Sequence, residues 1–188
     1  MSVVTPSVAT MTTDLSPERT DLLDTLHKHR ALFRGTVDGL SDEQAALTPT
    51  DSELCLGGLI KHVSATESEW ADFIERGAAT GPAIDWEQID WSDPPAEVVA
   101  YQHQFRMLEG ETLAALLAAY EEVAARTDAL VAAADLDLRH ELPAAPWFEP
   151  GASWSVRRTL IHVIAETAQH AGHADIIRES IDGRKSMG

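Results

Sequence analysis

The chain is poor in cysteine and in positive charge. It has a single cysteine, Cys55, in 188 residues, which excludes an internal disulfide framework and is typical of a reducing compartment, so we expect a cytoplasmic protein. Only 14 Lys and Arg stand against 31 Asp and Glu, giving a formal net charge of −17. Such a surface cannot neutralise a row of phosphates and is repelled by anionic lipid, so nucleic acid and membrane are excluded as partners.

Long apolar runs are also missing. None approaches the roughly 18 residues that span a bilayer, and residues 1–13, MSVVTPSVATMTT, lack the basic start and apolar centre of a signal peptide. We expect residues 1–13 to be a disordered tail and residues 14–188 to form one domain, long enough to bury a core. Lysine is scarce beside arginine and alanine is abundant, a bias typical of GC-rich genomes such as those of actinobacteria.

Apolar residues recur at helical spacing in four segments, and no convincing strand pattern competes with them. We expect helices over residues 16–37, 56–76, 109–134 and from 153 or 155 to about 181. Ser16 is a typical helix start, and Gly77 and Gly183 are typical helix ends. One short link, GLSDEQ, and two long connections predict an all-α four-helix bundle with crossover connections.

Residues 77–106 are the least regular part of the chain. They hold Trp86, Trp91 and a Pro-Pro pair among acidic residues, and a loop of that length in a compact domain is usually functional or mobile. We therefore expect this loop to border a ligand cleft, with Trp86 and Trp91 as candidates for its wall. Anchoring of the loop is the alternative role for these two side chains.

The most informative stretch is HVIAETAQHAGH, which runs from His162 to His173. At about 100° per residue on a helix, His162, Glu166, His170 and His173 fall within roughly 80° of one another. Apolar residues cover most of the remaining helix surface, so we expect this stripe to face a bundle interior or a cavity. A metal site is the direct interpretation, and a hydrogen-bonded or solvated polar seam is the alternative.

Spacing limits which of the four can share one ion. His162 and His170 are eight residues apart, which is about 12 Å along a helix axis, too far to share an ion easily. The pairs that remain are His162/Glu166, Glu166/His170 and His170/His173. Two ligands alone bind weakly, and bundle metalloproteins complete such pairs with residues from facing helices.

A partner for these pairs is found in GGLIKHVSATESEW, on the second expected helix. His62 lies at the edge of the apolar stripe of that helix and is the best candidate for a further ligand. Glu67 lies closer to the centre of the stripe, where a carboxylate needs a partner. It is a candidate for an additional ligand or for a group that supports the ligands. Cys55, just before a Gly-Gly pair, is interpreted as a small packing residue.

Three segments together resemble the DinB-like superfamily of four-helix metalloproteins: GLSDEQ, GGLIKHVSATESEW and SWSVRRTLIHVIAETAQHAGHADIIRESIDG. The last segment is the most specific of the three. The resemblance implies an up-down-down-up bundle with one divalent metal, usually zinc or nickel. In the superfamily one ligand is a histidine on the second helix and two more, four residues apart, lie on the fourth. Carried over, the ligands are His62, Glu166 and His170.

Many superfamily members have histidine where this chain has Glu166. The mycothiol-dependent maleylpyruvate isomerases, which are similar in this respect, use a His-Glu-His set. A carboxylate at this position implies a harder, anionic set of ligands. His162 and His173 remain candidates for extra ligands or supporting groups, and replacement of Glu166 by His173 as the third ligand stays open.

Superfamily members that resemble this chain use the low-molecular-weight thiols mycothiol or bacillithiol for conjugation or isomerisation. The resemblance implies an S-transferase or isomerase in which a metal-bound thiolate attacks a small electrophile, so that its partners are a small-molecule thiol and that electrophile. A hydrolase that activates water with Glu67 or His173 as base, and a non-enzymatic metal- or ligand-binding stress protein, are alternatives. An apolar helix face left unused by the core would favour a homodimer, which the sequence leaves open.

Overall fold

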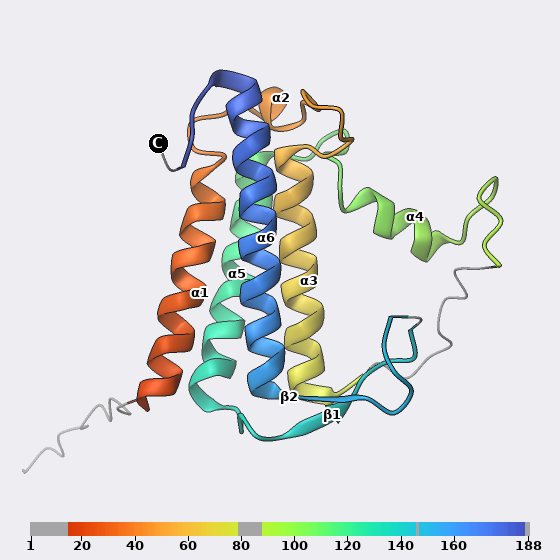
Figure 1. Cartoon of the computed structure of the whole chain (residues 1–188). Coiled ribbons are helices and arrows are strands. Elements are labelled where there is room, and N and C mark those ends of the chain that lie inside the picture. The colour runs from red at the N-terminus through yellow and green to blue at the C-terminus, as the bar shows by residue number, and fades with distance from the viewer. Residues whose placement is uncertain (1–14, 79–87, 146, 187–188) are drawn as a thin grey trace, which may run out of the picture.

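Four long helices form the body of the protein in the computed structural model, which describes residues 15–78, 88–145 and 147–186. The helices are α1 Pro17–Gly35, α3 Leu56–Arg76, α5 Leu113–Ala133 and α6 Val156–Asp182. In Figure 1, α1 and α6 run in one direction and α3 and α5 in the other, so the all-α, up-down-down-up bundle is confirmed. None of the described helices is both long and apolar enough to cross a membrane. The expected tail lies outside the described residues.

Helix ends follow the capping residues. The Ser16 hydroxyl accepts a hydrogen bond from a backbone N–H in the first turn of α1, and the Ser155 hydroxyl does the same for α6. Gly183 ends α6 with a left-handed φ of 80°, a conformation that glycine adopts without the steric cost of a Cβ. The GLSDEQ link forms the short helix α2, Asp42–Ala45, which Ser41 and Gln44 close with reciprocal hydrogen bonds.

Two groups of buried apolar side chains fill the bundle. The group around Phe33, Leu59 and Tyr120 lies toward α2, and the group around Leu26, Val131 and Leu160 lies toward the opposite end. Each fully buried side chain of this size contributes about 1.5–3 kcal/mol relative to an exposed one. α6 packs against α1 and α3, and α3 also packs against α5. Side chains on α6 can therefore meet side chains on α3.

Two parts of the chain differ from the sequence prediction. The expected loop at 77–106 contains a helix, α4 Ala96–His103, which begins after Pro95 and buries only Val98. Prolines and acidic residues around such a short helix obscure its periodicity. In addition, β1 Arg139–Glu141 and β2 Ser153–Ser155 form an antiparallel pair with His140 opposite Trp154. The sequence shows no convincing strand pattern at this pair because three residues are too few to show alternation.

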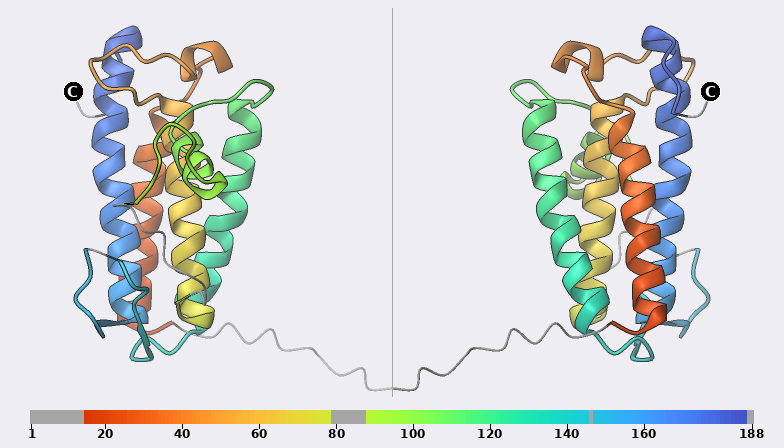
Figure 2. Two further views of the ribbon diagram at one scale, coloured as in Figure 1. Left: turned by 90° about the vertical axis from the view of Figure 1, so that its right-hand side faces the viewer. Right: turned by 90° about the vertical axis from the view of Figure 1, so that its left-hand side faces the viewer.

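α4 lies outside the four-helix body, next to α3. Both Figure 1 and the left view of Figure 2 place it beyond α3 on the side away from α1. The connection that follows α4 returns along the first turns of α3 before α5 begins at Leu113. The third long helix therefore starts later than residue 109, at the point where Thr112 caps it.

Candidate metal centre

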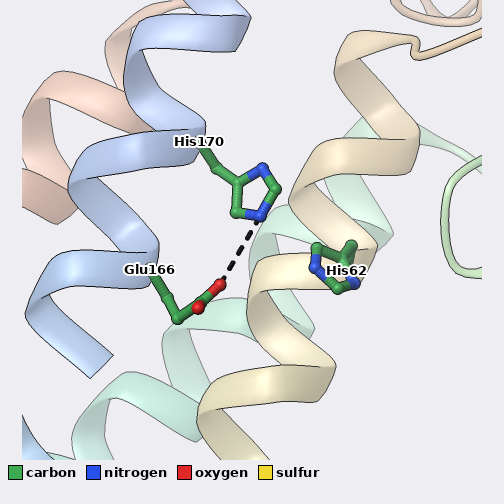
Figure 3. A group of neighbouring side chains, drawn as sticks. All are labelled: His62, Glu166 and His170. Atoms are coloured by element: carbon green, nitrogen blue, oxygen red, sulfur yellow. Dashed lines mark ion pairs between the residues drawn. The ribbon is translucent and has the colours of Figure 1, made fainter. Parts of the chain in front are cut away.

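Three of the side chains singled out in the sequence converge between α3 and α6. Figure 3 shows Glu166 and His170 projecting from α6 toward His62 on α3, and the ligand atoms of the three residues all lie within 4.8 Å of one another. The His170 Nε2 is 3.6 Å from the Glu166 Oε2, and the rings of His62 and His170 meet edge to face with centroids 4.9 Å apart. Among the described residues, no other group of three or more His, Cys, Asp or Glu side chains is placed to hold an ion.

The donor set fits a divalent cation. Two imidazole nitrogens and one carboxylate oxygen, with a fourth position left open, are the ligands of catalytic zinc sites. Ligand atoms about 2.0–2.1 Å from a tetrahedral ion lie about 3.3–3.4 Å apart. The 3.6 Å between Glu166 and His170 is therefore close to the separation required. The other separations between ligand atoms in the group are no more than 4.8 Å.

Burial keeps the two histidines in the neutral form that binds metal. Desolvation lowers the pKa of His62 below its ordinary value, although the Gln104 side chain and the Glu166 charge act in the opposite direction. Desolvation, followed by repulsion from His62, lowers the pKa of His170 to about 4. Because a metal and a proton compete for the same imidazole nitrogen, these pKa values leave both nitrogens available at neutral pH.

The Glu166 carboxylate faces two histidines of its own helix. Its Oε2 lies near His170, while its Oε1 is 3.6 Å from the His162 Nε2. His162 is half-buried and lies next to the group of three without belonging to it. His173 is exposed, and its Nδ1 is 3.4 Å from the Nδ1 of His170. Of the three pairs that spacing allowed, the structure therefore brings Glu166/His170 to His62.

Glu67 has a different set of contacts. It lies five residues after His62, about 140° around α3, and is only 1% exposed. Arg30 donates to both of its carboxylate oxygens and also donates to Asp128 at 2.7 Å. The carboxylate is thus committed to an ion-pair network that joins α1, α3 and α5. These contacts favour a structural role over the ligand, supporting or base role that the sequence left open.

An aromatic wall continues from the group of three toward the hairpin end of the bundle. Trp70 and Trp154 are stacked with ring centroids 5.1 Å apart, and His162 meets both rings edge-on at 4.9 and 5.0 Å. The Arg158 guanidinium lies 4.6 Å from the Trp154 ring centre. The place of Trp70 beside the site could have been noticed from its spacing, since it lies eight residues, about two turns, after His62 on α3. Trp154 lies in β2, so helical spacing does not reveal its place.

A cleft of about 670 Å³ opens beyond Trp70 at the end of α3. Its lining combines apolar groups with charged ones: Glu69, Trp70, Asp72, Phe73, Arg76, Gly77, Ala78 and Pro143. Of the described part of the expected loop, Gly77 and Ala78 line the cleft, and Trp86 lies outside the described residues. Trp91 is 61% exposed and does not line the cleft.

The sequence interpretation missed two residues beside His62. Phe105 stacks on the His62 ring at a centroid distance of 4.2 Å, and the Gln104 Oε1 is 3.4 Å from the His62 Nδ1. Both follow α4 and reach the site only because the connection folds back over α3. The Gly57-Gly58 pair is the one signal of this close approach in the sequence.

Comparison with known proteins bears on the family and the fold. The family model described as Mycothiol-S-transferase matches residues 21–183 and so includes all three converging side chains. A crystal structure described as the conserved protein of locus from Enterococcus faecalis shares the fold, with a TM-score of 0.61 and 14% sequence identity over 88% of this chain and 97% of that chain. Curated protein sequences give no significant match. With a matching family model over most of its length and the fold expected for it, the chain belongs to the mycothiol S-transferase family, a DinB-like family.

Proposed function

We propose that the protein is a metal-dependent S-transferase or isomerase that uses a mycothiol-type thiol and acts on a small electrophile. The observation that carries the proposal is the convergence of His62, Glu166 and His170 in a member of a family described as S-transferases. His62 comes from α3 and the other two from α6, so formation of the site depends on the packing of these two helices.

The three side chains would hold one zinc or nickel ion. When bound, that ion supplies acidity, because it lowers the pKa of a coordinating thiol so that thiolate is present at neutral pH. Two neutral imidazoles and one carboxylate leave part of a divalent charge uncompensated, which favours an anionic sulfur at the open position. Because Glu166 is anionic, it leaves less positive charge at the ion than a third histidine would. It therefore weakens the binding of the anionic sulfur.

The transfer forms one S–C bond. The thiol releases its proton to solvent, and a sulfur lone pair bonds to the electrophilic carbon. In a substitution, the leaving group departs with the electron pair of the broken bond. In an addition, the adduct takes a proton back from solvent, and elimination of the thiol from such an adduct completes an isomerisation.

The aromatic wall and the cleft provide room for the organic parts of the reactants. The cleft volume of about 670 Å³ lies within the range of roughly 300–1,000 Å³ that is usual for small-molecule sites. Trp70 belongs both to the wall and to the cleft lining, so a molecule with its reactive atom near His62 can extend along α3 into the cleft. The rings of Trp70 and Phe73 offer apolar contact, and Glu69 offers a hydrogen-bond acceptor.

Conjugation assays test this proposal. The metal-loaded protein should consume a mycothiol-type thiol in the presence of an aryl halide, and His62→Ala and His170→Ala should abolish that consumption. His27→Ala is the matched control, because this histidine lies on α1 and pairs with Asp128 on the surface. Consumption that is equally fast in all variants would contradict the proposal.

The alternatives give different results in the same assays. A hydrolase would turn over an ester or amide without added thiol, yet one of its two candidate bases, Glu67, is bound by Arg30 and the other, His173, is exposed. A non-enzymatic binding protein would take up metal with no turnover for any pair of thiol and electrophile. Thiol dependence therefore separates the proposed transferase from both alternatives.

A further inference from the structure

The connection after α4 crosses the first turns of α3 and contacts His62. We call residues 104–107 the strap. The strap places the Gln104 Oε1 at 3.4 Å from the His62 Nδ1 and stacks Phe105 on the His62 ring, with an angle of 29° between the ring planes. His170 approaches the same imidazole edge-on. His62 is thus confined by the strap and by α6 at once.

The backbone of the strap lies very close to the backbone of the first turn of α3. A Cβ added to Gly58 would lie 2.0 Å from the backbone oxygen of Phe105, and one added to Gly57 would lie 2.2 Å from the Met107 Sδ. No other amino acid fits at Gly58 without displacement of the strap backbone, because every other side chain begins with a Cβ. The Gly57-Gly58 pair therefore sets how closely the strap approaches α3.

Polar contacts fix the strap along the helix. The Lys61 Nζ donates to the backbone oxygen of Arg106 at 3.0 Å and to Glu111 at 2.7 Å. Glu111 in turn accepts the backbone N–H of Leu108 at 2.7 Å. Lys61 directly precedes His62, so the residue that anchors the strap and the residue that the strap contacts are neighbours on α3.

We propose that the strap positions His62 for metal binding, with Gln104 and Phe105 as its positioning residues. A histidine that ligates through one ring nitrogen donates its other N–H to an acceptor, which fixes the tautomer and the ring orientation. The Gln104 carbonyl is that acceptor for Nδ1, which leaves the Nε2 lone pair for the ion. Phe105 fixes the ring plane. This inference rests on the proposed metal site.

Metal affinity of the Gln104 variants is the first test. Loss of such an acceptor typically weakens metal binding about 10- to 100-fold, so Gln104→Ala should weaken zinc binding by that factor in competition with a chromogenic chelator. Gln104→Glu keeps an acceptor oxygen and should restore most of the affinity. Gln102→Ala is the matched control on α4 and should bind zinc as the unmodified protein does. Equal weakening in Gln104→Ala and Gln104→Glu would overturn the role of the acceptor.

Substitutions at Gly58 and Gly172 test the anchor without changing a residue that contacts the metal. Gly58→Ala pushes the strap away from α3, so zinc affinity should fall and the visible absorption of the cobalt-substituted site should shift. Gly172→Ala makes the same chemical change on α6, where a Cβ meets nothing within 4 Å, and should leave both readouts unchanged. If Gly58→Ala does not fold, the Gln104 variants decide the question.

The outcomes distinguish this inference from the proposed function. If the unmodified protein binds no zinc, the proposed metal site itself fails. If it binds zinc and His62→Ala loses it, but Gln104→Ala, Phe105→Ala and Gly58→Ala bind zinc normally, the strap inference alone is overturned. Unfolding of the metal-free Gln104→Ala protein at the usual denaturant concentration would show that its effect lies in the site.

Discussion

Replacement of Glu67 by glutamine is the perturbation that best separates the structural network from the candidate site. Glu67 is 1% exposed and Arg30 is 4% exposed, so the charge on Arg30 would lose its buried partner and keep the partly exposed Asp128. Removing one member of a buried ion pair costs about 3–5 kcal/mol, a large share of the roughly 5–15 kcal/mol that stabilises a typical domain. Because Asp128 still pairs with Arg30, we expect Glu67→Gln to lower the free energy of unfolding by about 3 kcal/mol, the lower end of this range, in a urea titration.

The matched control is Glu75→Gln on the same helix. Glu75 pairs with Arg126 at the surface, and an exposed pair contributes only about 0–1 kcal/mol. A double variant, Arg30→Met with Glu67→Leu, should recover most of the loss, because apolar replacement of a whole buried pair is often neutral or stabilising. Folded Glu67→Gln and the double variant should both keep the metal. Normal stability combined with loss of metal would refute this reasoning and make Glu67 part of the site.

Three further predictions concern single residues. Because burial lowers the pKa of His170 to about 4, the unfolded chain binds the proton first as the pH falls. The contribution of neutral His170 to the free energy of unfolding should therefore be complete above about pH 6.5 and be lost toward pH 4. In urea titrations of the metal-free protein, the free energy of unfolding should fall less between pH 7 and pH 5 in His170→Ala than in the unmodified protein. The buried Tyr120 hydroxyl has no hydrogen-bond partner among the described residues, so Tyr120→Phe should leave the unfolding free energy unchanged or raise it by up to about 1 kcal/mol; a loss above 1 kcal/mol would show that the hydroxyl is paired. Trp70→Ala removes a wall of the cleft and should raise the KM of an organic reactant roughly 3- to 10-fold, with metal content as the control; an unchanged KM would place the reactants elsewhere.

The bounds of α3 were predicted accurately. α3 spans the expected residues from Leu56 to Arg76 because its apolar stripe is regular and Gly77 stops it. α4 was missed because it buries little beyond Val98 and therefore shows almost no periodicity. The hairpin was missed because its pairing depends on residues 139–141 and 153–155, which come together only in the fold.

The candidate site was predictable only in part. Spacing on one helix selects Glu166 and His170 as one of three pairs, and the pattern of the second helix makes His62 the best candidate for a further ligand. Family resemblance was needed to choose among the three pairs. Gln104 and Phe105 could not be predicted from local pattern, because their contact with His62 depends on the path of a connection. That path depends on the absence of a Cβ at Gly58, which the sequence shows as a Gly-Gly pair without indicating what approaches it.

The metal stoichiometry of untagged protein tests the central claim most directly. Measured by mass spectrometry after purification and reconstitution, it should be one zinc or nickel ion per chain in the unmodified protein and in His27→Ala. It should fall to near zero in His62→Ala, Glu166→Ala and His170→Ala. A protein without metal after reconstitution, or one that keeps a full equivalent in all three ligand variants, would contradict the account.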